Sequence, residues 1–534
     1  MHAHTPRLIP SRTRLGSFGL LLLALACSDE TRFIDSSMEA EQPSGSDPNS
    51  GANDSAGNAS SGNQSSGNTS SGNASSGNAS SGNANGNQQE GNDPSLGLSG
   101  SGGVTEPPPA AAGSEVDVSG EINEDTTWTA DKTYLLQGTS PVFVVGNHTL
   151  TIEPGTLVKG AGVGTALVVT RGSRLVANGT KEEPIVFTSG VSAGLRNAGD
   201  WGGVVLLGSA RLNEPAGAIE GIASTDSRGA YGGPAANEGD DTSDCGSLKY
   251  VRIEFAGYQY SVDNELNGLT LGGCGSRTVI DYVQIHRGFD DGIELFGGTV
   301  DIKHALITNQ TDDGLDWDRG WTGRGQFIIV RTDPGVSDAA IEADNRDKNN
   351  GAIPRSNPTL FNLTLVGDKG TSASPGLVLR RGTFGAIHNA IVMGFPVAAI
   401  DIRDAESVDG ATGDLLSVTN SIFFSNGAEG TAHADTKSDG TTAATATTPA
   451  TPLADALDEG PWLLERQNQL SVDPLLADAY VQDGPKFLPP ANSPAAAGGL
   501  APPANDFFEA TTYIGALPPG GADWTEGWTA YPLR

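Results

Sequence analysis

From about residue 115 onward the chain alternates short apolar runs, many of them β-branched, with turns rich in Gly, Asp and Asn. Runs of this length and composition predict β-strands rather than helices. The pattern also repeats, because residues 290–295 return as residues 312–317, and residues 283–285 as residues 305–307, 22 positions later in both cases. Self-similarity at a fixed period indicates an architecture in which each unit stacks on the one before it.

One four-residue motif consists of Gly or Ala, an apolar residue, a variable residue and, in most copies, a second large apolar residue. It occurs six times, with steps of 24, 22, 26, 36 and 23 residues between successive copies. A period of about 22 residues accommodates three short strands and three turns, and stacked parallel strands lie ~4.8 Å apart. We therefore predict an all-β fold, a right-handed single-stranded parallel β-helix. A sandwich or barrel, the competing all-β fold, would not repeat residue types at this step. The motif starts at Gly268, Gly292, Gly314, Ala340, Gly376 and Ala399, and a second column starts at Tyr250, Tyr282, Asn362, Asn389 and Asn420.

Composition adds information mainly about the surface. Glycine accounts for 73 of the 534 residues, which suits repeated corners because Gly adopts positive φ without strain. The 31 Lys and Arg against 64 Asp and Glu give a formal charge of −33. This charge repels phosphate backbones, so nucleic-acid binding is excluded as a function.

Residues 1–26 predict a lipoprotein signal peptide, because three arginines precede an apolar stretch over residues 15–26 that is too short to span a bilayer. Residues 24–27 (Ala-Leu-Ala-Cys) resemble the lipobox of bacterial lipoproteins, in which the cysteine, here Cys27, is lipidated after cleavage. The alternative is an ordinary secretory signal with an incidental cysteine. With Ser28 next in the chain, the resemblance implies an exported outer-membrane lipoprotein, anchored in the membrane at the cell surface or the periplasmic face.

The rest of the chain divides into two parts. Residues 27–112 hold almost no large apolar side chains, so they predict the lipidated cysteine followed by a disordered Gly/Ser/Asn tether. Residues 113–534 are the predicted β-helix domain with a C-terminal capping tail. Because the open ends of a β-helix expose strand edges, we expect Trp524 and Trp528 to cap one end and residues 115–134 the other.

Several stretches of the domain resemble a family of bacterial surface lipoproteins. The similarity covers roughly residues 125–530 and implies the pectate-lyase-like β-helix fold. No activity is established for that family, so the resemblance implies no reaction. The stretches are residues 150–157, 200–204, 248–255, 290–298, 471–474, 492–494, 513–516 and 523–528.

Two cysteines remain within the predicted domain. Cys245 and Cys274 are 29 residues apart, about one turn of the coil plus a loop. In the oxidising compartment that an exported protein enters, a disulfide between them is expected. The alternative is two buried thiols that never meet. A metal site is disfavoured because neither has a second Cys or a His at ligand spacing.

An acidic ladder runs along one predicted outer face. In residues 293–295 (Ile-Glu-Leu) the apolar side chains point inward, so Glu294 points outward. The repeat places Asp316 and Glu342 on the next two turns of the coil, about 5 Å apart per turn. A second outward column holds Asp318, Asp344, Arg380 and Arg403, and the turn residues Asp290, Asp291, Asp312 and Asp313 lie at the edge of the face.

Stacked like charges must be neutralised, and three interpretations of the ladder stay open. The first is a solvated or arginine-paired surface. The second is a Ca²⁺ site, calcium being the one cofactor that the sequence suggests. The third is a catalytic site that cleaves a polysaccharide. The candidate calcium ligands are Glu294, Asp316, Asp318, Glu342 and Asp344, and the candidate catalytic residues are Asp316, Glu342 and Arg380.

Together these features predict an exported, lipid-anchored β-helix protein that presents a glycan- or surface-binding face, with calcium in one interpretation. The alternative is a carbohydrate-active enzyme, a polysaccharide lyase or glycoside hydrolase, that uses the acidic ladder. Aromatic side chains on the outside would either stack on sugar rings or pack the corners. The candidates are Trp201, Trp317, Trp321, Tyr258 and Tyr260.

Overall fold

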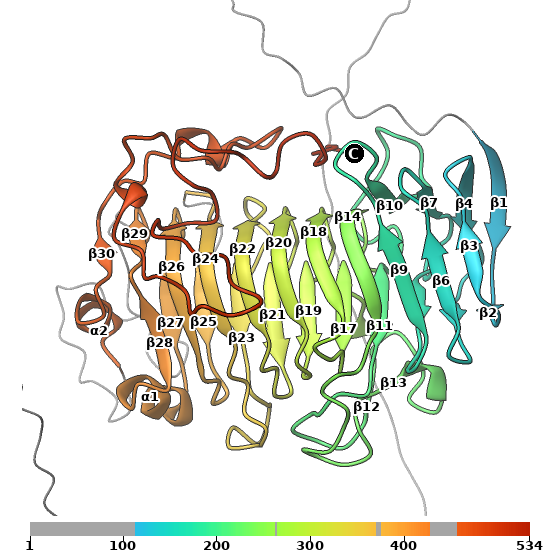
Figure 1. Ribbon diagram of the computed structural model, residues 1–534, viewed down its shortest axis with the longest axis horizontal. Coiled ribbons are helices and arrows are strands. Elements are labelled where there is room, and N and C mark those ends of the chain that lie inside the picture. Colours follow the sequence, from blue (N-terminus) through green and yellow to red (C-terminus); the bar gives the residue numbers. More distant parts are fainter. Residues whose placement is uncertain (1–112, 262–263, 370–374, 428–456) are drawn as a thin grey trace, which may run out of the picture. The chain divides into compact units, whose positions relative to one another are not determined.

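The computed structural model of the chain describes residues 113–261, 264–369, 375–427 and 457–534. The signal peptide, Cys27 and the tether predicted for residues 1–112 lie outside the described residues. The described part is a coil of parallel strands (Figure 1), which confirms the predicted all-β parallel β-helix. Among its helices none has the length and apolar character needed to cross a membrane.

Two long sheets form the walls of the coil. The first is 16-stranded, with parallel pairing between its neighbours. Its strands are β1 (Ser114–Val118), β3 (Thr126–Trp128), β4 (Lys132–Leu136), β6 (Thr149–Ile152), β7 (Leu157–Gly160), β9 (Arg174–Asn178), β10 (Ile185–Ser189), β14 (Gly246–Glu254), β18 (Val279–His286), β20 (Asp301–Thr308), β22 (Arg324–Arg331), β24 (Thr359–Val366), β26 (Gly385–Met393), β28 (Leu416–Thr419), β29 (Ile422–Phe424) and β30 (Gln469–Leu470).

The second sheet is 10-stranded and also parallel. Its strands are β2 (Glu121–Ile122), β5 (Val142–Val144), β8 (Leu167–Val169), β11 (Val204–Leu207), β17 (Leu269–Gly272), β19 (Ile293–Phe296), β21 (Leu315–Asp318), β23 (Ile341–Ala343), β25 (Leu377–Leu379) and β27 (Ile400–Ile402).

The loops of the coil contain short hairpins and helices. Two antiparallel hairpins lie in its loops, β12 (Gly217–Ala218) with β13 (Ala230–Tyr231), and β15 (Gln259–Ser261) with β16 (Asn264–Glu265). The helices are α1 (Ala405–Thr412), α2 (Glu459–Leu464) and the 3₁₀ helices η1 (Ser227–Gly229), η2 (Ala477–Tyr480) and η3 (Pro494–Ala496).

The long strands of the 16-stranded sheet bend in the middle, which gives each turn of the coil three walls. In β14 the first half pairs with β9 and the second half with β10, and the bend between them is at Tyr250, with φ 49°. Positive φ is unusual for residues other than glycine, yet it recurs at the equivalent position of each long strand. There the side chains stack, with ring centroids 4.4 Å apart for Tyr250 and Tyr282. The column consists of Tyr250, Tyr282, His304, Phe327, Asn362, Asn389 and Asn420.

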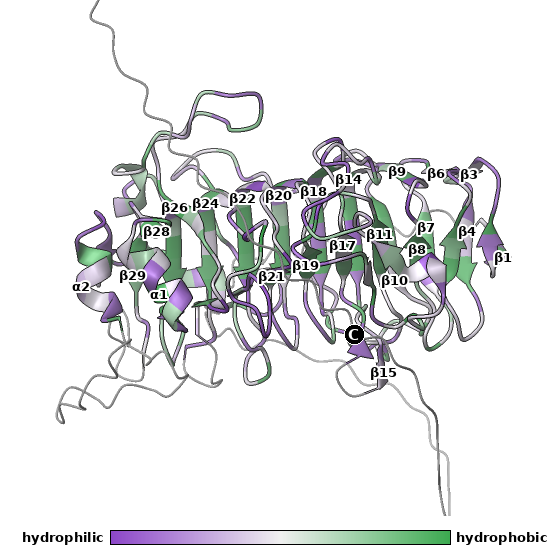
Figure 2. Cartoon of the chain, turned by 90° about the horizontal axis from the view of Figure 1, so that it is seen from below, coloured by the Kyte–Doolittle hydropathy of each residue, from purple (hydrophilic) through white to green (hydrophobic). Residues whose placement is uncertain are grey.

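The inward side chains of all three walls form one continuous apolar core. It is lined by Val, Ile and Leu, and nearly all are fully buried. Figure 2 shows the strands as the hydrophobic part of the chain and the loops as the hydrophilic part. Trp462 and Leu463 of α2 join this core at its C-terminal end, and the Trp462 indole donates to the Ala411 carbonyl of α1 at 3.1 Å. Helix α2 therefore covers the end of the coil.

The C-terminal segment, residues 498–532, runs back along the outside of the 16-stranded sheet (Figure 1). Side-chain amides hold it at intervals: Asn420 donates to Gly498 O at 3.1 Å, Asn362 to Tyr513 O at 3.0 Å, and Gln284 to Ala530 O at 2.7 Å. We call this segment the strap.

The expectation that Trp524 and Trp528 cap an end of the coil was wrong, because both belong to the strap. Trp528 packs edge-on against Tyr250 and Tyr282, and Trp524 packs against Tyr282 and His304, on the side of the coil rather than over its end. The physical reason is the aromatic stack, because it leaves a continuous apolar flank that needs cover. Residues 115–134 contribute the first turn of the coil itself through β1, β2 and β3.

A long excursion between β11 and β14 covers the N-terminal half of the outer face of the 10-stranded sheet. Its side chains Leu212, Ile219 and Tyr231 pack on Val205 and Phe296 in a separate apolar cluster. Strands β12 and β13 of this excursion lie below β11 and β17 in Figure 1. The outer face of β19 to β27, beyond the excursion, carries the acidic residues.

Candidate functional site

The register of the 10-stranded sheet positions the acidic ladder. Strand β19 pairs with β21 so that Glu294 lies opposite Asp316, and β21 pairs with β23 so that Asp316 lies opposite Glu342. The flanking Ile293 and Leu315 are fully buried in the core. Because successive side chains of a strand point to opposite faces, the three carboxylates stand outside the coil on consecutive turns.

Arginine neutralises one part of this face. Arg380 forms ion pairs with both Glu342 and Asp344, with 3.0 Å between its Nε and Oδ1 of Asp344. Arg319 binds Asp318, with 3.2 Å between Nε and Oδ2. Burial lowers the pKa of the Arg380 guanidinium, but the neighbouring carboxylates outweigh it and leave that pKa raised. Arg380 is therefore a fixed positive charge.

Seven other carboxyl groups, which we call the carboxylate cluster, have no such partner. Among the described residues, no Lys, Arg or His side chain forms an ion pair with any of them. In three triplets, one carboxylate oxygen from each residue lies within 4.8 Å of the others. The triplets are Asp290, Asp291 and Asp312; Asp291, Glu294 and Asp316; and Asp312, Asp313 and Asp338.

Hydrogen bonds between turns hold the cluster in place. The Asp291 Oδ1 atom accepts from the Asp313 amide at 2.9 Å, and Asp313 Oδ1 accepts in turn from the Ala339 amide. Asn267, at the equivalent position one turn earlier, donates from Nδ2 to Glu294 Oε2 at 2.6 Å. Its own Oδ1 is buried and has no hydrogen-bond partner among the described residues. The corner aspartates thus brace the backbone while presenting free carboxylate oxygens.

Burial and mutual repulsion raise the pKa of six of these groups above the ordinary value, which favours the protonated form: Asp290, Asp291, Glu294, Asp312, Asp313 and Asp316. Burial first, then the neighbouring carboxylates, raises the pKa of Asp290 to about 8. The same causes raise the pKa of Asp316 well above its usual range, and its Oδ1 is buried without a hydrogen-bond partner. At neutral pH the cluster is therefore stable only with bound protons or with a cation. The pKa is also raised well above the ordinary value for Asp291, Glu294 and Asp313.

The donor atoms fit a hard divalent cation. The three triplets contain carboxylate oxygens only, with no His or Cys. Calcium takes six to eight oxygen ligands, and its flexible geometry tolerates carboxylates and amide carbonyls together. Zinc and copper prefer nitrogen or sulfur. The cluster can therefore hold Ca²⁺, with Asp291, Glu294 and Asp316 as the most enclosed set.

The structure divides the predicted ligands into two groups. Glu294 and Asp316 belong to the carboxylate cluster, whereas Asp318, Glu342 and Asp344 are bound by arginines. Arg403 extends the second column and pairs with Asp401 of β27. Sequence reasoning missed Asp338 and Asn267. Asp338 could have been found, since 290, 312 and 338 are separated by the same 22 and 26 residues as the strand motif.

Three of the expected sugar-stacking aromatics are not on the surface. Trp201, Trp317 and Trp321 are at most 1% exposed and belong to the core, so their expected outward position was wrong, and of the two alternatives these side chains pack rather than stack on sugar rings. Their indole nitrogens donate to buried acceptors, as in the 3.0 Å bond from Trp321 to the Val300 carbonyl. Tyr258 and Tyr260 are half-buried and contact each other edge-on.

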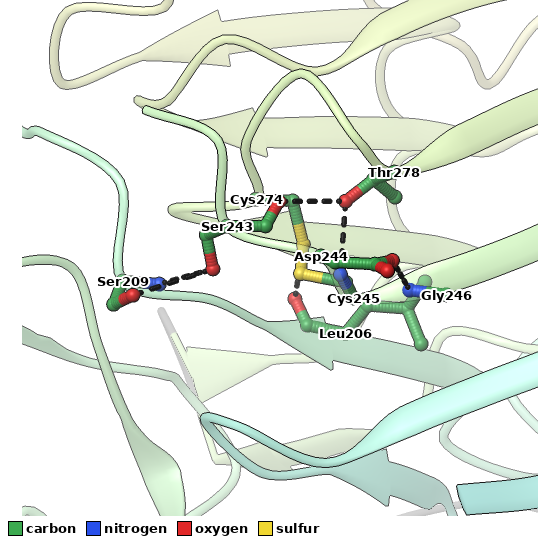
Figure 3. Close-up of a disulfide and its surroundings, with 8 residues drawn as sticks. All are labelled: Leu206, Ser209, Ser243, Asp244, Cys245, Gly246, Cys274 and Thr278. Atoms are coloured by element: carbon green, nitrogen blue, oxygen red, sulfur yellow. Dashed lines mark hydrogen bonds between the residues drawn. A yellow bond between two sulfur atoms is a disulfide. The ribbon is translucent and has the colours of Figure 1, made fainter. Parts of the chain in front are cut away.

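The predicted disulfide is confirmed: Cys245 and Cys274 are joined, with 5.8 Å between their Cα atoms (Figure 3). Cys245 precedes β14 and Cys274 follows β17, and the Cys245 amide donates to Thr278 Oγ1 at 2.9 Å. The bond fixes the return of the excursion to the neighbouring corner of the coil. It therefore supports the wall next to the carboxylate cluster.

Comparison with known proteins agrees with this architecture. A family model described as "Pectate-lyase like beta helix domain" matches residues 120–460. The chain belongs to this family. The matched range of the pectate-lyase-like β-helix domain includes the whole carboxylate cluster and ends before the strap. No curated protein and no solved structure shows a significant match to the chain.

Proposed function

We propose that the protein is an exported, lipid-anchored β-helix protein whose 10-stranded sheet presents a Ca²⁺-dependent face to a glycan or a cell surface. One observation carries the proposal: the seven carboxyl groups of the carboxylate cluster, five of them buried or half-buried and two exposed, lie together without a basic partner among the described residues. One turn further along, Arg380 neutralises Glu342, which lies opposite Asp316 of the cluster, and also Asp344.

Calcium explains why this uncompensated charge is retained. Burying carboxylates side by side is costly, because they lose hydrating water and repel one another. A bound divalent cation offsets that cost, since it coordinates the carboxylate oxygens and neutralises their charge. An ion held by carboxylates at an open face keeps positions for water or for a ligand's hydroxyl and carboxylate oxygens. Sugars offer these groups, so the proposed partner is a glycan.

The anchoring part of the proposal rests on the sequence of residues 1–27. Lipidation of Cys27 would fix the chain to a membrane, and the tether would hold the coil away from it. Labelling cells with a fatty acid that carries a clickable group tests this. The Cys27→Ser variant should lose both the label and the membrane fraction, and a labelled Cys27→Ser variant would contradict the anchor.

Calcium binding is tested by thermal melting and calorimetry in chelator and in added Ca²⁺. At a free Ca²⁺ concentration a hundred times the dissociation constant of the site, the free energy of unfolding of the wild-type chain should rise by about 2.7 kcal/mol. Asp316→Asn should lose most of that gain. Asp506→Asn is the matched control, because Asp506 is 90% exposed and pairs with Arg324 away from the cluster. An unchanged melting curve of the wild type in Ca²⁺ refutes the proposal.

A second candidate function, glycoside hydrolysis or polysaccharide lysis, is favoured by the protonation of two carboxyl groups on the same face. Burial raises the pKa of both Asp318 and Glu342 to about 7, the range in which a general acid works efficiently. Release of reducing sugar or of unsaturated product from polysaccharides tests it. Glu342→Gln and Asp316→Asn should abolish such release, and activity that survives both changes would place the chemistry elsewhere.

A further inference from the structure

A pocket opens beside the end of β18, where the strap passes the coil. It is open, has a volume of about 660 Å³, and is built from loop, corner and strap residues that are far apart in the sequence. Its size lies in the range of small-molecule sites. The lining residues used below are Gly194, Arg287, Asp483 and residues 531–534.

Arg287 is the unusual member of this lining. It follows β18, and its side chain has neither an ion pair nor a hydrogen-bond partner among the described residues. Its Nε is buried and unsatisfied. Among the described residues other arginines have side-chain partners, such as the two carboxylates that Arg380 binds or the Thr242 carbonyl to which Arg277 donates. An arginine that lines a pocket without an ion pair or side-chain hydrogen bond among the described residues is a candidate anion site, because guanidinium binds oxyanions through two parallel N–H bonds.

The other residues that line the pocket could contact the hydroxyl groups and the apolar part of an organic anion. Asp483 lines the same pocket without forming an ion pair with Arg287, so it is available to accept a hydrogen bond from a hydroxyl group. Pro532 and Leu533 offer an apolar surface, and Leu533 is 50% exposed. This wall is fixed, because His286 Nε2 donates to Pro532 O at 3.0 Å and the Gly194 amide donates to the main-chain oxygen of Arg534 at 2.9 Å.

We propose that this pocket binds a hydroxylated organic anion of the size of one acidic sugar. The oxyanion would accept from the Arg287 guanidinium, a hydroxyl would donate to Asp483, and the C–H face of the ring would pack on Pro532 and Leu533. None of the residues that line the pocket belongs to the carboxylate cluster, so this inference does not depend on the proposed function.

The test is calorimetric titration of the full chain in chelator, which leaves the carboxylate cluster out of the reaction. The probes are glucuronate, glucose as the same ring without the carboxylate, and sodium sulfate as a bare oxyanion. Glucuronate should bind at least about tenfold more tightly than either, since a charged hydrogen-bond pair contributes roughly 1.5–3 kcal/mol. Equal affinity for glucose overturns the anion site, and equal affinity for sulfate overturns the organic ligand and leaves an adventitious ion only.

Variants assign the binding to these side chains. Arg287→Gln should weaken glucuronate binding by about tenfold or more, and Asp483→Asn should weaken glucuronate but not sulfate. Arg277→Gln is the matched control, because Arg277 is exposed and its side chain donates only to the Thr242 carbonyl. Asp483 is exposed, so its variant reports on the site even if Arg287→Gln folds poorly. Unchanged glucuronate affinity in Asp483→Asn and in a folded Arg287→Gln refutes the proposal.

Discussion

In the absence of divalent cations the protein should become more stable as the pH falls from 8 to 6. Three carboxyl groups on the acidic face carry the prediction. The pKa is raised by burial to about 7 for Asp318 and Glu342 and to about 8 for Asp290. In the unfolded chain these groups titrate near pH 4. Because the folded state binds more protons across this interval, stability rises on acidification and is lost as the pH rises through the folded pKa values.

The size of the effect follows from the proton uptake. Between pH 8 and pH 6, a group with a folded pKa near 7 contributes about 1.4 kcal/mol, and one near 8 contributes about 2 kcal/mol. The sum, about 5 kcal/mol, is an upper bound because neighbouring carboxyl groups compete for protons. His286 and His388 also oppose it, since burial lowers their pKa to about 4 and only the unfolded chain protonates them near pH 6. For the roughly 390 residues that the structure describes, the unfolding entropy is about 0.8 kcal/mol per degree, so each 1.4 kcal/mol raises the melting temperature by about 1.7 °C.

The assay is thermal melting in chelator at pH 6, 7 and 8. A rise of about 3–5 °C toward pH 6 is expected. Asp318→Asn should remove about 1.7 °C of it, because the amide cannot titrate. Asp506→Asn should keep the full rise, since that side chain is 90% exposed. A melting temperature that is flat or falls toward pH 6, or an unchanged slope in Asp318→Asn, would show that these groups do not carry raised pKa values.

Three further outcomes follow from named contacts. Cys274→Ser should lower stability by about 3–4 kcal/mol, the loop-closure value for a 29-residue separation, and reduction of the wild type should lower the melting temperature equally. Trp528→Ala should cost roughly 3–5 kcal/mol because the indole is fully buried, and limited proteolysis should then cut the strap first. Arg380→Gln should cost about 3–5 kcal/mol by leaving Glu342 unpaired and Asp344 with Arg381 alone, and much of this loss, measured by melting, should be recovered at pH 6.

The sequence predicts the coil and its register well because both depend on local repetition. Gly292, Gly314 and Ala340 recur at nearly constant steps, and consecutive strands of the 10-stranded sheet pair at the residues that these steps imply. The apolar residues of each strand then decide which side chains face outward. This reasoning needs no knowledge of distant contacts.

The sequence pattern could not predict the strap, or which outer faces of the coil are covered by loops, because these features depend on segments that do not repeat. Nothing periodic connects Trp528 with Tyr250 and Tyr282, although the two parts lie about 250 residues apart and pack together. The same limit explains the misplaced tryptophans. Trp201 and Trp321 occur in corners, where strand alternation does not apply, and only the packing shows that they point inward.

The strap also bears on how the molecule comes apart. A stacked solenoid can in principle unravel from either end, one layer at a time. Here Asn420, Asn362 and Gln284 are all bonded to one continuous segment. The layers that it crosses cannot peel away singly while it stays in place, so their loss is expected to be concerted. Folding carries the same condition in reverse, because the late-synthesised residues lock layers that were made long before them.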